Sequence, residues 1–174
     1  VRPYTEREMG KRLRVVWSGA EYRGRGRETI WDGHATVTGN VIQAVQPINF
    51  YNLEKTLQHT SPTTVTWQAL TTGGWSGFDC WLEDPYAGSL AVSTPLTQFS
   101  MPIANIGMEE TIYEAGELAR QVRVSRLPDR NPHTHLTLER TMTLRPQGDN
   151  PLYVYVVQED GHLAWSSPIY LFKG

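Results

Sequence analysis

The sequence of 174 residues has little cysteine, no long hydrophobic stretch and almost no excess charge. Its one cysteine, Cys80, excludes an internal disulfide. No apolar stretch approaches the roughly 18 residues of a membrane helix. We therefore expect a soluble protein without membrane association, in the cytoplasm or the periplasm.

The formal net charge of −2 gives the chain no general attraction for nucleic acid. Charge is unevenly distributed, however. Residues 1–30 and 120–145 are rich in arginine, whereas residues 46–119 contain Lys55 and eight carboxylates. We expect the basic strands to lie beside the acidic ones in the fold, so that most of these charges pair.

The length and the 39% hydrophobic content fit one domain with one core. We predict a single domain over residues 1–174. Because the sequence starts at Val1 rather than at a methionine, we also expect it to be a fragment of a longer protein.

Alternation of apolar and polar residues with a period of two is the dominant pattern, and it is typical of half-buried strands. Evidence for helices is thin, since Gly107 and Gly116 interrupt the best helical stretch. Turn residues recur every 8–12 positions. The sequence therefore predicts an all-β, two-layer antiparallel β-sandwich of about ten to twelve short strands. The clearest strands are expected at residues 12–17, 64–70, 121–126, 134–144 and 151–157.

Turn chemistry predicts how neighbouring strands connect. Asp32-Gly33 lies between residues 29–31 and 35–38, a strong signal for a tight hairpin, and residues 41–46 would continue it as a meander. Residues 78–82 and 90–93 are expected to form another hairpin across the turn at 84–88.

The predicted strand at 134–144 has one anomalous residue. Its even positions are apolar except for Arg140, which we expect to be held by a carboxylate or to reach solvent at a sheet edge. Residues 152–157 are apolar on both faces, as in a central strand covered by two layers.

His133 and His135 would share one face of a strand and could chelate zinc. A zinc site needs further ligands, and none lies at a characteristic spacing, so we expect no metal and no cofactor in this chain.

The sequence offers little evidence for catalytic groups. Cys80 follows the apolar alternation of Phe78 and Leu82, which indicates a buried, unreactive thiol. Asp79, Glu83 and Asp84 could form a carboxylate pair or a calcium site, but Asp84 precedes proline in a sequence typical of an ordinary turn. The Arg-Gly stretch at 23–27 is better explained as a loop than as an RNA-binding tract.

Aromatic residues offer a possible binding site. Trp75, in the glycine-rich segment 73–77, and Tyr86, in the next loop, could stack on the apolar faces of sugars. The other tryptophans that follow strand patterns are better explained by core packing, namely Trp17, Trp31, Trp67 and Trp165.

Several segments resemble the C-terminal β-rich region of DUF3604 proteins, which are large bacterial proteins similar to metal-dependent phosphoesterases of the PHP type. The resemblance is carried by GDNPLYV at 148–154, QEDGHLAWSSPIY at 158–170, RVVWSGA at 14–20, RGR at 25–27, WDG at 31–33, GFD at 77–79 and WLE at 81–83. The family's metal ligands belong to a catalytic barrel, and no segment here matches that barrel.

The resemblance implies a non-catalytic accessory domain that packs on a neighbouring catalytic domain of the same polypeptide. Arginine is enriched at interfaces, so we expect the contact to involve Arg14, Arg25, Arg27, Arg123 and Arg126. Two alternatives remain open at this stage. One is a carbohydrate-binding module that uses Trp75 and Tyr86, and the other is a small metal-dependent hydrolase with an unrecognised site.

Overall fold

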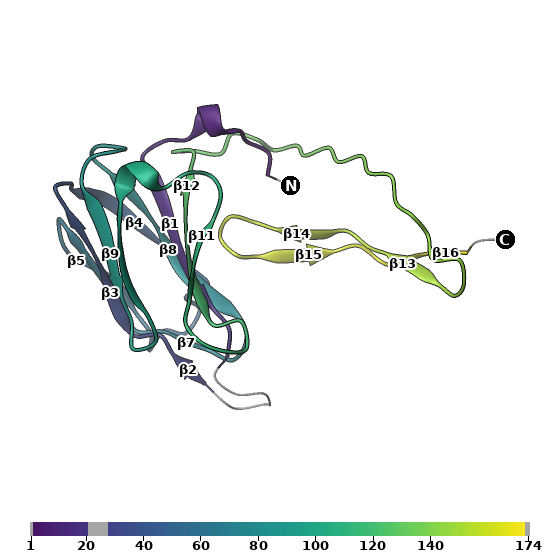
Figure 1. Ribbon diagram of the computed structural model, residues 1–174, viewed down its shortest axis with the longest axis horizontal. Helices are drawn as coiled ribbons and strands as arrows, with labels where there is room; N and C mark the ends of the chain where they lie inside the picture. Colours follow the sequence, from purple (N-terminus) through teal and green to yellow (C-terminus); the bar gives the residue numbers. More distant parts are fainter. Residues whose placement is uncertain (1, 21–27, 173–174) are drawn as a thin grey trace. The chain divides into compact units, whose positions relative to one another are not determined.

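A computed structural model describes residues 2–20 and 28–172 of the chain (Figure 1). The chain divides into two compact units, one of residues 4–132 and the other of residues 1–3 and 133–174. Among the described residues, no helix has the length and apolar character needed to span a bilayer.

The larger unit is a two-layer sandwich of antiparallel sheets, as the sequence predicts. The first sheet has the order β11 (Thr111–Glu114), β12 (Gln121–Leu127), β1 (Arg12–Ser18), β8 (Trp75–Leu82) and β4 (Ile42–Ile48). The second has the order β10 (Gln98–Pro102), β9 (Ser89–Ser93), β3 (Gly33–Thr38), β6 (Thr64–Trp67) and β5 (Leu57–Ser61). A short pair, β2 (Thr29–Ile30) and β7 (Leu70–Thr71), and the 3₁₀ turns η1 (Glu6–Glu8) and η2 (Ile103–Asn105) complete the unit.

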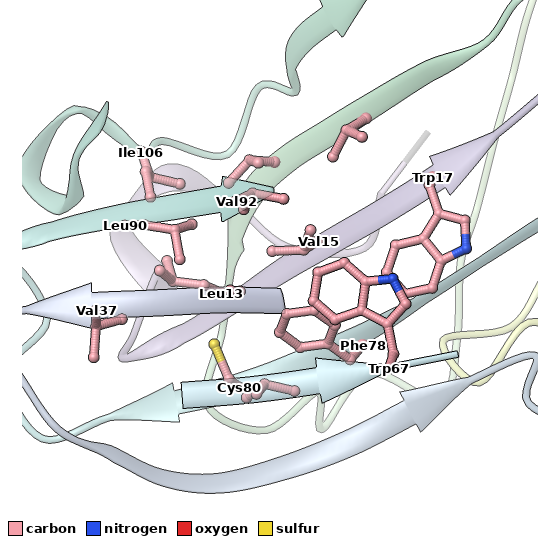
Figure 2. Close-up of a cluster of buried hydrophobic side chains, with 14 of the residues drawn as sticks. Leu13, Val15, Trp17, Val37, Trp67, Phe78, Cys80, Leu90, Val92 and Ile106 are labelled. Carbon is pink, nitrogen blue, oxygen red and sulfur yellow. The ribbon is translucent and has the colours of Figure 1, made fainter. Parts of the chain in front are cut away.

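Tryptophan side chains hold the core of the sandwich together (Figure 2). The rings of Trp17 in the first sheet and Trp67 in the second stack with centroids 4.8 Å apart, at an interplanar angle of 10°. The Trp67 indole donates a 2.5 Å hydrogen bond to the Trp31 carbonyl, and the Trp31 indole donates one to the Thr71 hydroxyl. Because the indole N–H groups of Trp31 and Trp67 have partners, these two rings are buried without an unsatisfied donor. The indole N–H of Trp17 is buried without a hydrogen-bond partner among the described residues, so its ring is held by packing alone.

The connections between strands differ from the predicted hairpins. β2 pairs with β7, whereas β3 pairs with β6 and β9, so Asp32-Gly33 does not close a hairpin. Instead, an Asp32 carboxylate oxygen accepts a hydrogen bond from the Ala69 N–H. The predicted meander and the second hairpin are also wrong, because β3 and β4 lie in different sheets, as do β8 and β9.

A shared contact explains both crossings between the sheets. The Asn40 side-chain amide, between β3 and β4, donates to the carbonyls of Asp84 and Ala87, between β8 and β9. Gly88 completes this junction with a φ of +81°, and a Cβ there would lie 2.0 Å from the Thr38 carbonyl oxygen. The two connections therefore stabilise each other as side-by-side crossovers.

The smaller unit is a single long hairpin preceded by an extended segment. β13 (Asn150–Leu152) pairs with β16 (Ile169–Leu171), and β14 (Tyr155–Val157) pairs with β15 (Leu163–Trp165). Residues 134–144 pair with no strand in the part of the chain that the structure describes, so the predicted place of this segment in the sandwich is wrong. No described strand lies beside it to accept its backbone hydrogen bonds.

The sandwich therefore ends within residues 4–132 and does not extend over 1–174 as predicted. All described hydrophobic residues that are buried lie between Leu13 and Leu127. Trp165 is largely exposed, against the prediction of a core role, and Tyr155, Val156 and Val157 are exposed rather than covered by two layers. Among the described residues of this unit, no second layer packs on the hairpin.

We expect Trp67→Ala to lower the free energy of unfolding by about 3–5 kcal/mol, because it leaves a cavity between the sheets. Urea denaturation followed by circular dichroism measures this loss. Trp165→Ala is the matched control and should change the value by less than about 0.5 kcal/mol. Equal losses in the two variants would contradict the assignment of the core.

Candidate functional site

The most highly organised polar group of the sandwich is a carboxylate shared by two arginines. On β1, Leu13, Val15 and Trp17 point into the core, so Arg12 and Arg14 point to the opposite face of the sheet. The register with β8 sets Asp79 directly across from Arg14. The Asp79 carboxylate accepts hydrogen bonds from Arg12 Nε at 3.0 Å and Nη2 at 2.5 Å, and from Arg14 Nε at 2.8 Å and Nη2 at 2.9 Å.

The centre of this outward face is buried, although such a face of a sandwich usually meets solvent, whereas its edge strands expose Gln46 and Ile112. Asp79 is 1% exposed, and Arg12, Val16 and Ile48 are buried beside it on the same face. The Arg12 guanidinium also lies 5.1 Å from the ring centroid of Trp81. A carboxylate at this depth is tolerated because two cations and four hydrogen bonds replace its hydration.

The predicted interface arginines fall into three groups. Arg14 and Arg123 lie on the outward face of the first sheet, where Arg123 forms a 3.1 Å ion pair with Glu110 near the sheet edge. Arg25 and Arg27 lie outside the described residues. Arg126 is the exception, because it does not lie on this face.

Arg126 is a predicted residue of the domain interface, but it stands opposite Leu13 in the strand register, points inward and is buried within the sandwich. Its guanidinium donates to the carbonyls of Ile103, Ile106 and Gly10 and lies over the Tyr86 ring. Burial lowers the pKa of this group below its usual value. Arg126 thus joins the 3₁₀ turn η2 and its C-cap residue Ile106 to Gly10, which precedes β1.

Trp75 and Tyr86 do not form a shared platform. Trp75 opens strand β8 rather than lying in a loop, and its carbonyl accepts a hydrogen bond from the Asn49 amide. Tyr86 follows the other end of the same strand. Eight residues of strand span about 25 Å, so the two rings cannot stack on one sugar.

The loop that carries Tyr86 is the predicted turn. One Asp84 oxygen accepts hydrogen bonds from the N–H groups of Tyr86 and Ala87, each at 2.8 Å. These bonds hold the pKa of the Asp84 carboxyl below its usual value. Asp79 therefore belongs to the ion pairs with Arg12 and Arg14, whereas Asp84 belongs to the turn. The predicted cluster of Asp79, Glu83 and Asp84 does not act as one carboxylate site.

His133 and His135 lie in the extended segment, both exposed and outside any strand. The nearby Asp129 carboxylate accepts a 2.6 Å hydrogen bond from the Lys11 N–H. Within residues 2–20 and 28–172, no three His, Cys, Asp or Glu side chains gather as a metal site would require.

The outward face of the second sheet is the exposed side of the sandwich, and it is uncharged. Its strands present mainly threonine, serine and glutamine, with His34 as the titratable side chain. Two open hollows lie on it. One is lined by Thr56, Gln58, Thr66, Trp67 and Gln68, and the other by His34, Ala91, Val92, Ser93, Gln98 and Phe99. Neither hollow brings acidic or nucleophilic side chains together.

Comparison with known proteins adds no family to this description: no family model, no curated protein and no solved structure matches the chain.

We expect Asp79→Ala to lower the free energy of unfolding by about 3–5 kcal/mol, because it leaves the buried Arg12 guanidinium and the partly buried Arg14 guanidinium without their carboxylate. Chemical denaturation at low and high salt measures the loss. Glu110→Ala removes a more exposed ion pair on the same sheet and should cost at most about 1 kcal/mol. A small loss for Asp79→Ala would show that the ion pairs of Asp79 with Arg12 and Arg14 are dispensable for stability.

Cys80 is buried, and burial raises the pKa of its thiol to about 12 from an ordinary 9.0. Because the thiolate is the reactive form, alkylation of the native protein at pH 8 should be about a thousandfold slower than alkylation of the urea-unfolded chain. Mass spectrometry after iodoacetamide treatment measures both rates. Comparable rates would contradict the burial of this thiol.

Proposed function

We propose that this chain is a non-catalytic accessory region of a larger protein, and that its C-terminal unit attaches it to a neighbouring domain of the same polypeptide. The observation that carries the proposal is the exposed apolar surface of the hairpin. Five aromatic side chains are between 49% and 69% exposed, namely Tyr153, Tyr155, Trp165, Tyr170 and Phe172. Exposed Val154, Ile169 and Leu171 lie among them in the sequence.

The size of this surface supports a partner. A buried aromatic side chain covers 150–250 Å², so the five half-exposed rings leave roughly 600 Å² uncovered. This summed area is comparable to the upper end of the largest contiguous apolar patch on a typical monomer, which is about 300–600 Å². The aliphatic side chains add to it.

The charge pattern supports the same conclusion. Residues 150–158 and 163–172 contain no Asp, Glu, Lys or Arg, whereas the turn between them contains Glu159 and Asp160. A two-stranded hairpin is at best marginally stable in water, and a hydrophobic surface on which to pack is what stabilises it. An uncharged hairpin of this kind fits a partner that covers it.

The resemblance to the β-rich region of DUF3604 proteins suggests the nature of the neighbour. That neighbour would be a metal-dependent phosphoesterase-like domain of the PHP type, and it would supply the metal ligands and the catalytic groups. The sandwich would serve as a rigid body, with its core closed by tryptophan packing and by the Asp79 ion pairs.

Hydrogen exchange of the hairpin amides tests the attachment. We expect residues 150–157 and 163–171 to exchange at least tenfold more slowly when the chain is joined to its neighbouring domain than when it is alone. Trp165→Asp in the joined protein should remove this protection, because it places a charge on the covered surface. Leu53→Asp is the control, since Leu53 lies in the sandwich unit and is 96% exposed. Equal exchange in both proteins would contradict the proposal.

The absence of catalysis is tested separately with p-nitrophenyl phosphate and added divalent metals. We expect the chain alone to leave this phosphoester intact. Metal-dependent hydrolysis by the chain, lost in His133→Ala or His135→Ala, would contradict the non-catalytic role.

A further inference from the structure

We infer that residues 134–144 are a β-strand donated to an open sheet edge of the neighbouring domain. This inference rests on the proposed function and specifies how the C-terminal unit attaches. The segment is called the arm below. Figure 1 draws it without a strand arrow, and no described strand pairs with it.

The first argument is the alternation of side chains along the arm. The even positions Leu136, Leu138, Met142 and Leu144 are apolar, and the odd positions are His135, Thr137, Glu139, Thr141 and Thr143. This is the pattern of a strand with one buried face, and threonine favours extended backbone. Yet Leu136, Leu138 and Met142 are each more than half exposed. The pattern therefore fits a sheet that the described chain does not provide.

The second argument is length. An eleven-residue strand spans about 36 Å. The longest strand of the sandwich, β8, has eight residues. An extended segment of this length with a full complement of backbone donors and acceptors suits strand addition to a sheet edge.

The third argument is charge. Arg140 lies on the apolar parity of the arm and is exposed, and no ion pair joins it to any residue that the structure describes. Packing the even-numbered side chains of the arm against a core would bury the Arg140 guanidinium, which would then require a carboxylate partner. The accepting edge strand should thus be apolar on one face, with an Asp or Glu across from Arg140.

The same charges disfavour a second copy of this chain as the partner. Antiparallel pairing of the whole arm with itself is centred on Glu139 and sets two Glu139 side chains directly opposite each other. A shift of the centre by one residue toward the C-terminus sets two Arg140 side chains opposite each other instead. Like charges directly across a strand pair destabilise it. A shift by one residue toward the N-terminus sets Arg140 opposite the apolar Leu136, where it has no carboxylate across from it.

Hydrogen exchange distinguishes this inference from the proposed function. With the chain joined to its neighbouring domain, we expect slow exchange at alternate arm amides, because an added strand directs every second N–H to its neighbour. Protection of the hairpin without protection of the arm would overturn the inference and leave the proposed function intact. Absence of protection in both segments would overturn both.

Two variants test which face is covered. In the joined protein, Leu138→Asp should lower the protection of the arm amides at least tenfold, whereas the matched variant Thr137→Asp, on the opposite parity, should lower it less than threefold. Equal effects of the two variants would overturn the strand assignment.

Variants of Arg140 and a measurement of the oligomeric state provide the remaining tests. Arg140→Glu should lower arm protection at least tenfold, and Arg140→Lys should retain it within threefold, since only the first reverses the charge that faces the acid. Light scattering should find the chain alone monomeric. A dimer of the chain with protected arm amides would show that a second copy is the partner and would overturn the inference.

Discussion

The first sheet of the sandwich depends on ion pairs between one carboxylate on β8 and two arginines on β1. Asp79 holds Arg12 and Arg14 on the face of the first sheet that points away from the core. The two strands at the centre of that sheet are thereby joined by charge-assisted hydrogen bonds as well as by their backbone ladder. With tryptophan packing on one face and this ion cluster on the other, the middle of the sheet is buried on both sides, and its edge strands are exposed on the outward face.

The smaller unit differs because its apolar side chains are mostly exposed rather than buried. Its hairpin strands are paired, but their side chains have no layer of their own to cover them. A sheet is stabilised by the apolar surface that it removes from water. A two-stranded hairpin alone buries too little apolar surface to be stable. The contrast between the well-packed sandwich and the exposed apolar hairpin is the basis of our proposal that the chain is an accessory region of a larger protein.

The strands of the sandwich were predictable because alternation is a local property. Residues 12–17 and 121–126 each show which side chains face the core, and the structure confirms both strands. Of the strand predicted at 64–70, residues 64–67 form β6, and residue 70 begins the separate strand β7. The buried Cys80 and the turn at Asp84 were predictable for the same reason. Pairing was not, because Asp32-Gly33 satisfies the local rules of a hairpin while Asp32 bonds to Ala69, far along the chain.

The sequence by itself determined an all-β chain, the positions of most of its sandwich strands and the faces they bury, since these depend on neighbouring residues alone. Tertiary structure decided which strands share a sheet, that Arg126 turns inward to cap the carbonyls of η2, and that Trp75 and Tyr86 lie at opposite ends of β8. It also decided that residues 134–144 have no strand partner in the described chain. The physical reason is that alternation shows what a strand would bury, whereas only the presence of a second surface decides whether it is buried.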